Sequence, residues 1–455
     1  MSKIISSQKH CTVNPLKMSQ SIGAALVFLG VENAMPLLHG SQGCTSFGLV
    51  LFVRHFREAI PMQTTAMSEV ATVLGGFENV EQALVNIAGR SKPALIGICT
   101  TGISEIKGDD LGGFLKTIRA NHPELDSIAL VDVSTPDFEG AFQDGWAAAV
   151  TQIIEELVEV PLIQQRETRR INVLPGCHIT PGDIDELRDI FNAFDLDPVF
   201  LPDLSGSLDG HIPEEFSPTT IGGISVAQIK KMGSALFTIA IGEQMHGAAI
   251  TLEHRTGVPY KLFDRLTGLA ANDALMKFLS TISGVPVPQK YRRQRSQLLD
   301  AMLDGHFYFG GMRVAIAAEP DLLSALAHWL HEMGCEIQAA VTTTQSPALD
   351  RLPVEEVVLG DLEDLEMRAA GADLLVTHSH GRQAAERLGI PLFRVGLPIF
   401  DRLGAGHRLS VGYRGTRDLI FEVGNLFLAS AHEPTPATWK TFESNAQPLV
   451  SLEAQ

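Results

Sequence analysis

Apolar runs that alternate with helix-like stretches are the feature that most constrains the fold of this 455-residue chain. The run over 170–176 is rich in strand-forming residues. The Thr-Pro-Gly-Asp sequence at 180–183 then supplies an N-cap, a proline at the first helical position and an early acid. We therefore expect a strand, a helix that ends at Phe194 and a second strand over 198–201.

The same order of elements recurs twice nearer the C-terminus. One unit has strands over 312–317 and 335–341 around a helix that ends at Met333, and the next unit spans 373–395. The N-terminal part behaves similarly, with buried strands expected over 94–98 and 128–133 and a long helix over 141–158. Strands that are apolar throughout indicate parallel sheets covered by helices on both faces.

Chain length bears on the number of domains. A single core stops growing at about 250 to 300 residues, so a chain of 455 residues requires more than one. We expect an α/β fold of three Rossmann-like domains with mainly parallel sheets, over 1–165, 166–305 and 306–455. Ligands bind beyond the carboxyl ends of such strands, which directs attention to loops such as 99–102 and 378–381.

Composition excludes several classes of partner. The formal net charge of −18 argues against nucleic acid, because such a partner requires a basic surface. The longest apolar runs, such as 235–241, are shorter than the roughly 20 residues that span a bilayer, and residues 1–10 lack the apolar region of a signal peptide.

The five cysteines form neither a dense disulfide framework nor a C-x-x-C zinc pattern. We expect a soluble, cytoplasmic protein with no nucleic-acid and no membrane partner.

Most isolated motifs have an ordinary structural interpretation. Neither a G-x-G-x-x-G fingerprint nor a P-loop is present, so nucleotide binding has no support. His378 and His380 could pair on a metal, but they lack a third ligand with zinc-like spacing, and we favour histidines that cap a strand end. Cys335 lies in a strand pattern and is expected to be a small buried hydrophobe. Cys177 follows Pro175-Gly176 and is interpreted as a loop thiol that could be exposed.

Cys11 and Cys44 form the candidate metal site. Cys44 ends the glycine-flanked turn His-Gly-Ser-Gln-Gly-Cys at 39–44, and a thiolate on such a small-residue loop is suited to a metal cluster. An amphipathic helix expected over 19–31 would bring both cysteine loops to a common side of the sheet. Two thiolates do not complete a [4Fe-4S] centre, which normally needs four protein ligands. If Cys44 binds a cluster, most of its ligands come from elsewhere.

A series of short motifs occurs in order along nearly the whole chain. They begin with Cys-Thr-x-Asn-Pro at 11–15 and the 39–44 turn, and they continue at 54–58, 100–110, 135–140, 174–176 and 396–402. In these motifs the chain resembles the β-type subunits of the nitrogenase molybdenum-iron protein superfamily. The resemblance implies three Rossmann-like domains, as the periodicity also does.

Two departures from the family pattern indicate which branch the chain resembles. Gly102 stands where nitrogenase β subunits have a third cluster cysteine, and Ala141 stands where they have a serine ligand. The chain therefore resembles the branch that serves as a scaffold for iron-molybdenum cofactor assembly, without independent turnover. The resemblance implies a [4Fe-4S] cluster at the subunit interface, with three cysteines from the partner and Cys44 from this chain. Cys11 ranks second as a ligand, and Cys99 ranks last.

The same resemblance implies partners. They are a NifE-like α-type subunit in an α2β2 heterotetramer, NifB as the precursor donor, and the iron protein NifH. The cofactor precursor would be held mainly by the NifE-like subunit. The segment Leu74-Gly75-Gly76-Phe77-Glu78-Asn79 resembles the surface that nitrogenase presents to its iron protein. A plain helix-capping glycine turn is the alternative interpretation of this segment.

Two alternatives remain open from the sequence. The chain could be the β subunit of a nitrogenase-type or protochlorophyllide-reductase-type oxidoreductase, or a metal-free tandem Rossmann module. The iron content of the purified heterodimer, beyond any bound precursor, distinguishes these possibilities. About eight irons indicate an eight-iron P-cluster, and about four irons indicate a [4Fe-4S] cluster. The absence of iron indicates the metal-free module.

Overall fold

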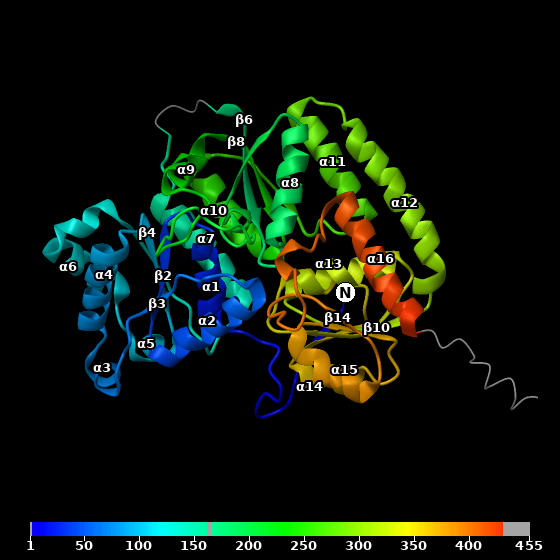
Figure 1. Cartoon of the computed structure of the whole chain (residues 1–455), viewed down its shortest axis with the longest axis horizontal. Coiled ribbons are helices and arrows are strands. Elements are labelled where there is room, and N and C mark those ends of the chain that lie inside the picture. Colours follow the sequence, from blue (N-terminus) through cyan, green and yellow to red (C-terminus); the bar gives the residue numbers. More distant parts are fainter. Residues whose placement is uncertain (1, 162–165, 431–455) are drawn as a thin grey trace, which may run out of the picture.

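The computed structural model describes residues 2–161 and 166–430, which form three parallel β-sheets with helices packed around them (Figure 1). Every strand pair in this part of the chain is parallel, so the predicted α/β class with parallel sheets is confirmed. The predicted boundary at residue 165 and the end of the chain beyond 430 lie outside the described residues.

The first sheet carries the candidate site. Its strand order is β3 (Gln63–Thr64), β2 (Ala34–His39), β4 (Leu95–Thr100), β5 (Ala129–Val133). Every residue of β2 and β4 is buried, because helices cover both faces of the sheet. Helices α4 (Phe77–Ser91) and α6 (Leu111–Asn121) pack on one face, and α1 (Gln20–Leu29) and α7 (Phe142–Leu157) pack on the other (Figure 1).

The second sheet has the order β7 (Asp197–Phe200), β6 (Glu167–Pro175), β8 (Ala235–Ile241), β9 (Tyr260–Phe263). The predicted helix after β6 is present as α8 (Pro181–Ala193). Its N-terminus is a capping box: the Asp183 amide donates to the Thr180 hydroxyl at 3.0 Å, and the Thr180 amide donates to the Asp183 carboxylate at 3.2 Å. The local sequence signal at 180–183 therefore placed this helix correctly.

The third sheet combines both ends of the chain. Its order is β1 (Lys3–Ser6), β12 (Glu356–Leu359), β11 (Glu336–Thr342), β10 (Arg313–Ala317), β13 (Leu374–Thr377), β14 (Leu392–Arg394). Strand β1 lies at the edge and pairs with β12, so residues 3–6 belong to this sheet although they stand at the start of the chain. Cys335 precedes β11 by one residue and is buried, as predicted.

The remaining helices connect these layers. They are α2 (Gln42–Phe56), α3 (Glu69–Leu74), α5 (Gly102–Lys107), α9 (Val226–Lys230), α10 (His246–Thr256), α11 (Leu269–Ser283), α12 (Gln289–Phe309), α13 (Pro320–Glu332), α14 (Leu362–Arg368), α15 (Arg382–Leu388) and α16 (Gly412–Ser430). Helix α16 packs along α12 and also contacts α11 and α8 (Figure 1). Across residues 2–161 and 166–430, the structure contains no helix with the length and apolarity to cross a bilayer.

Helix α1 differs from the expectation of an amphipathic helix, because all ten of its residues are buried. It lies between the first sheet and α7, and its C-terminal end contacts loops beside the second sheet. The carbonyl of Gly30 accepts hydrogen bonds from the amides of Asp203 at 3.0 Å and Ile224 at 3.1 Å. One continuous hydrophobic cluster consequently includes residues of all three sheets. A helix surrounded on every side has no polar face.

Glycines permit the close crossing of α1 and α7. A Cβ at Gly23 would overlap the carbonyl oxygen of Phe142, and a Cβ at Gly145 would overlap the carbonyl of Gln20. We expect Gly23→Ala to lower the stability of the protein by about 2 kcal/mol or more, since the neighbouring atoms are backbone and do not yield. Thermal unfolding followed by circular dichroism measures the effect.

Gly89→Ala is the matched control. Gly89 lies in the exposed part of α4, and no atom lies within 4 Å of a Cβ built there. This change should leave the unfolding temperature unchanged or raise it slightly, because alanine favours a helix over glycine by roughly 0.5–1 kcal/mol. Equal unfolding temperatures for the two variants would contradict the packing argument.

Candidate functional site

Cys44 lies at the start of a helix rather than in a loop, which corrects the sequence expectation. Ser41 has extended backbone and serves as the N-cap, so α2 begins at Gln42 and Cys44 is in its first turn. The Ser41 hydroxyl is 3.5 Å from the sulfur of Cys44, and the cysteine is half-buried. The N-terminus of a helix favours negative charge, so a thiolate is well placed there.

Cys44 faces a hollow of about 490 Å³ between the first and third sheets. Lys17, Asp137, His378 and His380 also line this hollow. Within residues 2–161 and 166–430, no group of three or more histidine, cysteine or acidic side chains is placed to hold a metal. Among the described residues, Cys44 is the cysteine that lines this hollow.

His378 follows β13 and caps the short helical turn Ser379–Gly381, and His380 lies within that turn. The ring Nδ1 of His378 accepts a hydrogen bond from the amide of His380 at 3.3 Å, and the two rings meet edge to face at 5.1 Å. Burial lowers the pKa of His378 to about 4 and also lowers the pKa of His380. Both rings are therefore neutral near pH 7, and they hold the loop that borders the hollow.

The other cysteines do not join Cys44. Cys11 is exposed and does not line the hollow. Its segment is fixed elsewhere, because Lys9 pairs with Asp361 and the amide of Val13 donates to that carboxylate at 2.8 Å. Cys99 is buried within β4, where burial raises the pKa of its thiol.

Gly102 and Ala141, the positions where the resemblance implies cluster ligands in nitrogenase β subunits, have no side chain that could bind a metal. The amide of Gly102 donates to the Asp137 carboxylate at 3.0 Å, and a Cβ at 102 would lie 3.3 Å from Asp137. Ala141 is fully buried as the N-cap of α7, and its amide donates to Asp144 at 2.6 Å. The Asp137 carboxylate therefore packs against the backbone at the place of the missing cysteine.

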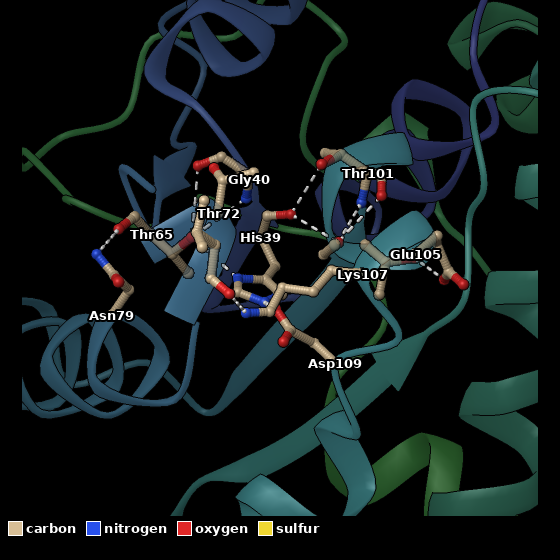
Figure 2. A network of polar contacts seen from close by, with 12 residues as sticks. His39, Gly40, Thr65, Thr72, Asn79, Thr101, Glu105, Lys107 and Asp109 are labelled. Atoms are coloured by element: carbon tan, nitrogen blue, oxygen red, sulfur yellow. Dashed lines mark hydrogen bonds and ion pairs between the residues drawn. The ribbon is translucent and has the colours of Figure 1, made fainter. Parts of the chain in front are cut away.

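The segment 74–79 joins α3 to α4. Leu74 is 81% exposed, whereas Phe77 packs edge to face on Phe114 with ring centroids 5.3 Å apart. Exposed apolar side chains gather around Leu74; we call Val70, Val73, Leu74 and Ile106 the apolar patch. Lys107 of α5 donates to the carbonyl of Val73 at 2.9 Å, which holds α3 and α5 together beneath the patch (Figure 2).

A buried histidine connects this segment to the cysteine. His39 ends β2 and is fully buried. Its ring nitrogens lie 3.0 Å from the hydroxyl of Thr65 and 3.2 Å from the carboxylate of Asp109, while its carbonyl accepts from Thr101 at 3.0 Å (Figure 2). Burial lowers the pKa of His39, and the hydrogen bond that the ring makes to the Asp109 carboxylate opposes that shift.

Gly76 and Asn79 rest directly on this network. A Cβ at Gly76 would overlap the His39 ring and lie 2.9 Å from the Asp109 carboxylate. Asn79 donates to the carbonyl of Thr65 at 3.2 Å (Figure 2). The predicted docking segment therefore contacts the residue five positions before Cys44. The sequence did not indicate the contact between His39 and Gly76, although His39 lies in the 39–44 motif and Gly76 lies in the 74–79 segment.

The comparisons with known proteins agree with this geometry. The family model for nitrogenase component 1 type oxidoreductases matches residues 19–428. A chain of the solved structure "Nitrogenase Cp1 at pH 6.5" superposes with a TM-score of 0.88 and 30% identity, over 99% of this chain and 98% of that chain. The chain therefore belongs to the nitrogenase component 1 type oxidoreductase family.

Particular relatives narrow the assignment within that family. The nitrogenase iron-molybdenum cofactor biosynthesis protein NifN of Bradyrhizobium diazoefficiens is 61% identical over 447 residues, which covers 97% of this chain and 95% of that protein. NifN of Klebsiella pneumoniae is 41% identical over 435 residues, which covers 95% of this chain and 94% of that protein. The chain is thus NifN-like, and the resemblance inferred from its motifs is confirmed.

The contact between Gly76 and His39 yields a prediction. Gly76→Ala should displace the His39 ring, which Thr65 and Asp109 hold in place, and should lower stability by about 1–3 kcal/mol. Hydrogen exchange should become faster in 74–79 and in 39–44. Gly112→Ala in α6 is the control, because its Cβ would meet only Asp110, at an ordinary 3.8 Å. Unchanged exchange in the Gly76 variant would show that the contact is unimportant.

Proposed function

We propose that this chain is the β-type subunit of a scaffold on which the precursor of the nitrogenase iron-molybdenum cofactor is matured. Near-full-length similarity to NifN proteins carries the proposal. The lost ligand positions support it, because Gly102 and the buried Ala141 supply no side-chain donor at two positions where a larger cluster would be bound. The same two positions disfavour a catalytic nitrogenase β subunit. The chain itself would provide binding surfaces and one ligand, without independent turnover.

Cys44 would supply one ligand of a [4Fe-4S] cluster shared with a NifE-like subunit in an α2β2 heterotetramer. The exposed face of α2 supports this placement. Phe47 is 64% exposed and Val50 is 52% exposed, one and two turns along the helix from the cysteine. Large apolar side chains exposed together mark an interface with another protein. When bound, the cluster would supply one-electron transfer between partners, and the precursor would be held mainly by the NifE-like subunit.

The apolar patch and the segment 74–79 would receive the iron protein NifH. Support comes from the exposure of Leu74 and its neighbours above a rigid, hydrogen-bonded base. Exposed Glu78 adds a charge at the edge of this surface. NifB would deliver the precursor to the assembled scaffold. These partner assignments follow from the family resemblance, and the exposed apolar patch supports the assignment of NifH.

Replacement of Cys44 tests the ligand assignment. Alanine does not replace the charged iron–thiolate bond, so Cys44→Ala in the assembled heterotetramer should leave one iron without its protein ligand. Because three ligands would remain on the partner, we expect partial iron loss or an altered electron paramagnetic resonance spectrum, with the fold preserved. Iron analysis and spectroscopy of the anaerobically purified complex measure this.

Cys335→Ala and Cys177→Ala are the controls, because neither residue lines the Cys44 hollow. Both variants should keep the iron content and spectrum of the unchanged complex. If the Cys44→Ala complex also kept its iron, its spectrum and full cofactor maturation, Cys44 would not be a ligand. The cluster would then be bound by Cys11 together with the partner, or by the partner subunit alone.

The docking surface has its own test. Leu74→Asp should weaken nucleotide-dependent association with the iron protein at least about tenfold, since a charge would be buried in an apolar contact. Glu78→Lys should change the salt dependence of the association rate. Ile212→Asp is the matched control, because Ile212 is 92% exposed and lies in a loop of the second domain. Equal binding by the Leu74 and Ile212 variants would remove the support for this surface.

A further inference from the structure

A second cavity, of about 100 Å³, lies where the three sheets meet. Its walls come from the segments that follow strands of the second and third sheets and from three helices beside the first sheet, α1, α2 and α7. Cys177 and His178 follow β6, Glu319 follows β10, Leu26 belongs to α1 and His55 to α2. Ligands in open α/β sheets bind beyond the carboxyl ends of strands, so the cavity has the location of a binding site.

The lining is largely apolar. Leu26, Phe142, Leu322, Leu326 and Phe393 form much of the wall. Small-molecule sites in proteins share this character: a concave apolar surface with a few polar groups that fix the orientation of the ligand.

The two histidines in the wall are uncharged. The ring Nδ1 of His55 accepts a hydrogen bond from the amide of Ile399 at 2.9 Å, so the ring proton lies on Nε2. Burial lowers the pKa of His55 to about 4, and it lowers the pKa of His178 to about 4 as well. The Nδ1 atom of His178 is buried and has no hydrogen-bond partner among residues 2–161 and 166–430. A buried polar atom of this kind favours a partner that supplies the missing bond.

The remaining polar groups carry no free charge either. Burial raises the pKa of Glu319 to about 8, so its carboxyl group is mostly protonated at neutral pH. Burial also raises the pKa of the Cys177 thiol. Arg408 lines the cavity, but its guanidinium pairs with Glu422 at 2.7 Å and stacks over the Phe393 ring.

We propose that this cavity binds a small uncharged organic molecule with an apolar body and one carbonyl or hydroxyl group. The polar end would meet His178, His55 and Glu319, and the body would lie against Leu322 and Leu326. A volume of about 100 Å³ accepts about four or five non-hydrogen atoms, judged against an engineered apolar cavity of about 150 Å³ that binds benzene. A carboxylate of the same size is excluded, because it would be buried without a free cation.

The cavity adjoins the proposed cluster site. Met18 lines both this cavity and the hollow of Cys44. A bound molecule would therefore touch the segment that forms one wall of the cluster hollow. The proposal does not rest on the proposed function, because it depends only on residues of this chain.

The test uses the intact heterotetramer, purified anaerobically, with 2-butanone as the neutral probe and butyrate as its charged counterpart. Saturation-transfer nuclear magnetic resonance at pH 7 should detect 2-butanone and not butyrate. Leu322→Phe fills the cavity and should weaken 2-butanone binding at least tenfold. Val85→Phe is the matched control, because Val85 lines a separate hollow beside α4 and should leave binding unchanged.

Two results would overturn the proposal: equal binding of 2-butanone by the Leu322 variant and the unchanged complex, or binding of butyrate as strong as that of 2-butanone. If Leu322→Phe does not fold, the proposal is tested by soaking crystals of the unchanged complex in 2-butanone. The expected result is density in the cavity, with the carbonyl oxygen within hydrogen-bond distance of His178, His55 or Glu319. Density at other positions only would refute the assignment.

Discussion

The complete burial of α1 is the constraint on which the rest of the molecule depends. A helix without a solvent-facing side must be surrounded by other elements, and here these are the first sheet, α7 and the loops of the second domain. The crossing with α7 requires glycine at 23 and 145, since a side chain at either position would overlap backbone atoms. The same helix also separates the two cavities: Ile22 lines the Cys44 hollow and Leu26 lines the cavity between the sheets.

Local signals predicted much of the fold. The capping residues Thr180 and Asp183 placed α8, because their hydrogen bonds lie within one turn. The complete burial of α1 was not predicted, since the helical spacing of its apolar residues suggested an amphipathic helix with one exposed face. Gln20 is satisfied inside the protein by donating to the carbonyl of Glu139 at 3.0 Å, a contact 119 residues away in sequence. The pairing of β1 with β12 spans an even longer separation and has no local signature.

In the candidate site, too, local features were predicted from the sequence and contacts between distant residues were not. The motif at 39–44 identified Cys44 from its neighbours in sequence, but the N-cap at Ser41 moved the cysteine from a loop into a helix. The pair of His39 and Asp109 was missed because its partners are 70 residues apart and meet only when β2 and the loop after α5 are folded. The contact of Gly76 with His39 was missed for the same reason, although the glycine itself was noted as a helix cap.

These contacts explain why one chain can carry both a docking surface and a single cluster ligand. The apolar patch lies on α3 and α5, which Lys107 joins, and Gly76 and Asn79 fix the adjoining segment to His39 and Thr65. From His39 the backbone runs directly through Gly40 and Ser41 into the helix of Cys44. The apolar patch is therefore connected to the first turn of α2 through hydrogen-bonded residues up to His39 and then through the short turn of Gly40 and Ser41. The proposed docking surface and the proposed cluster ligand are thus connected by elements around the first sheet, and the remaining ligands of the proposed cluster would come from the partner subunit.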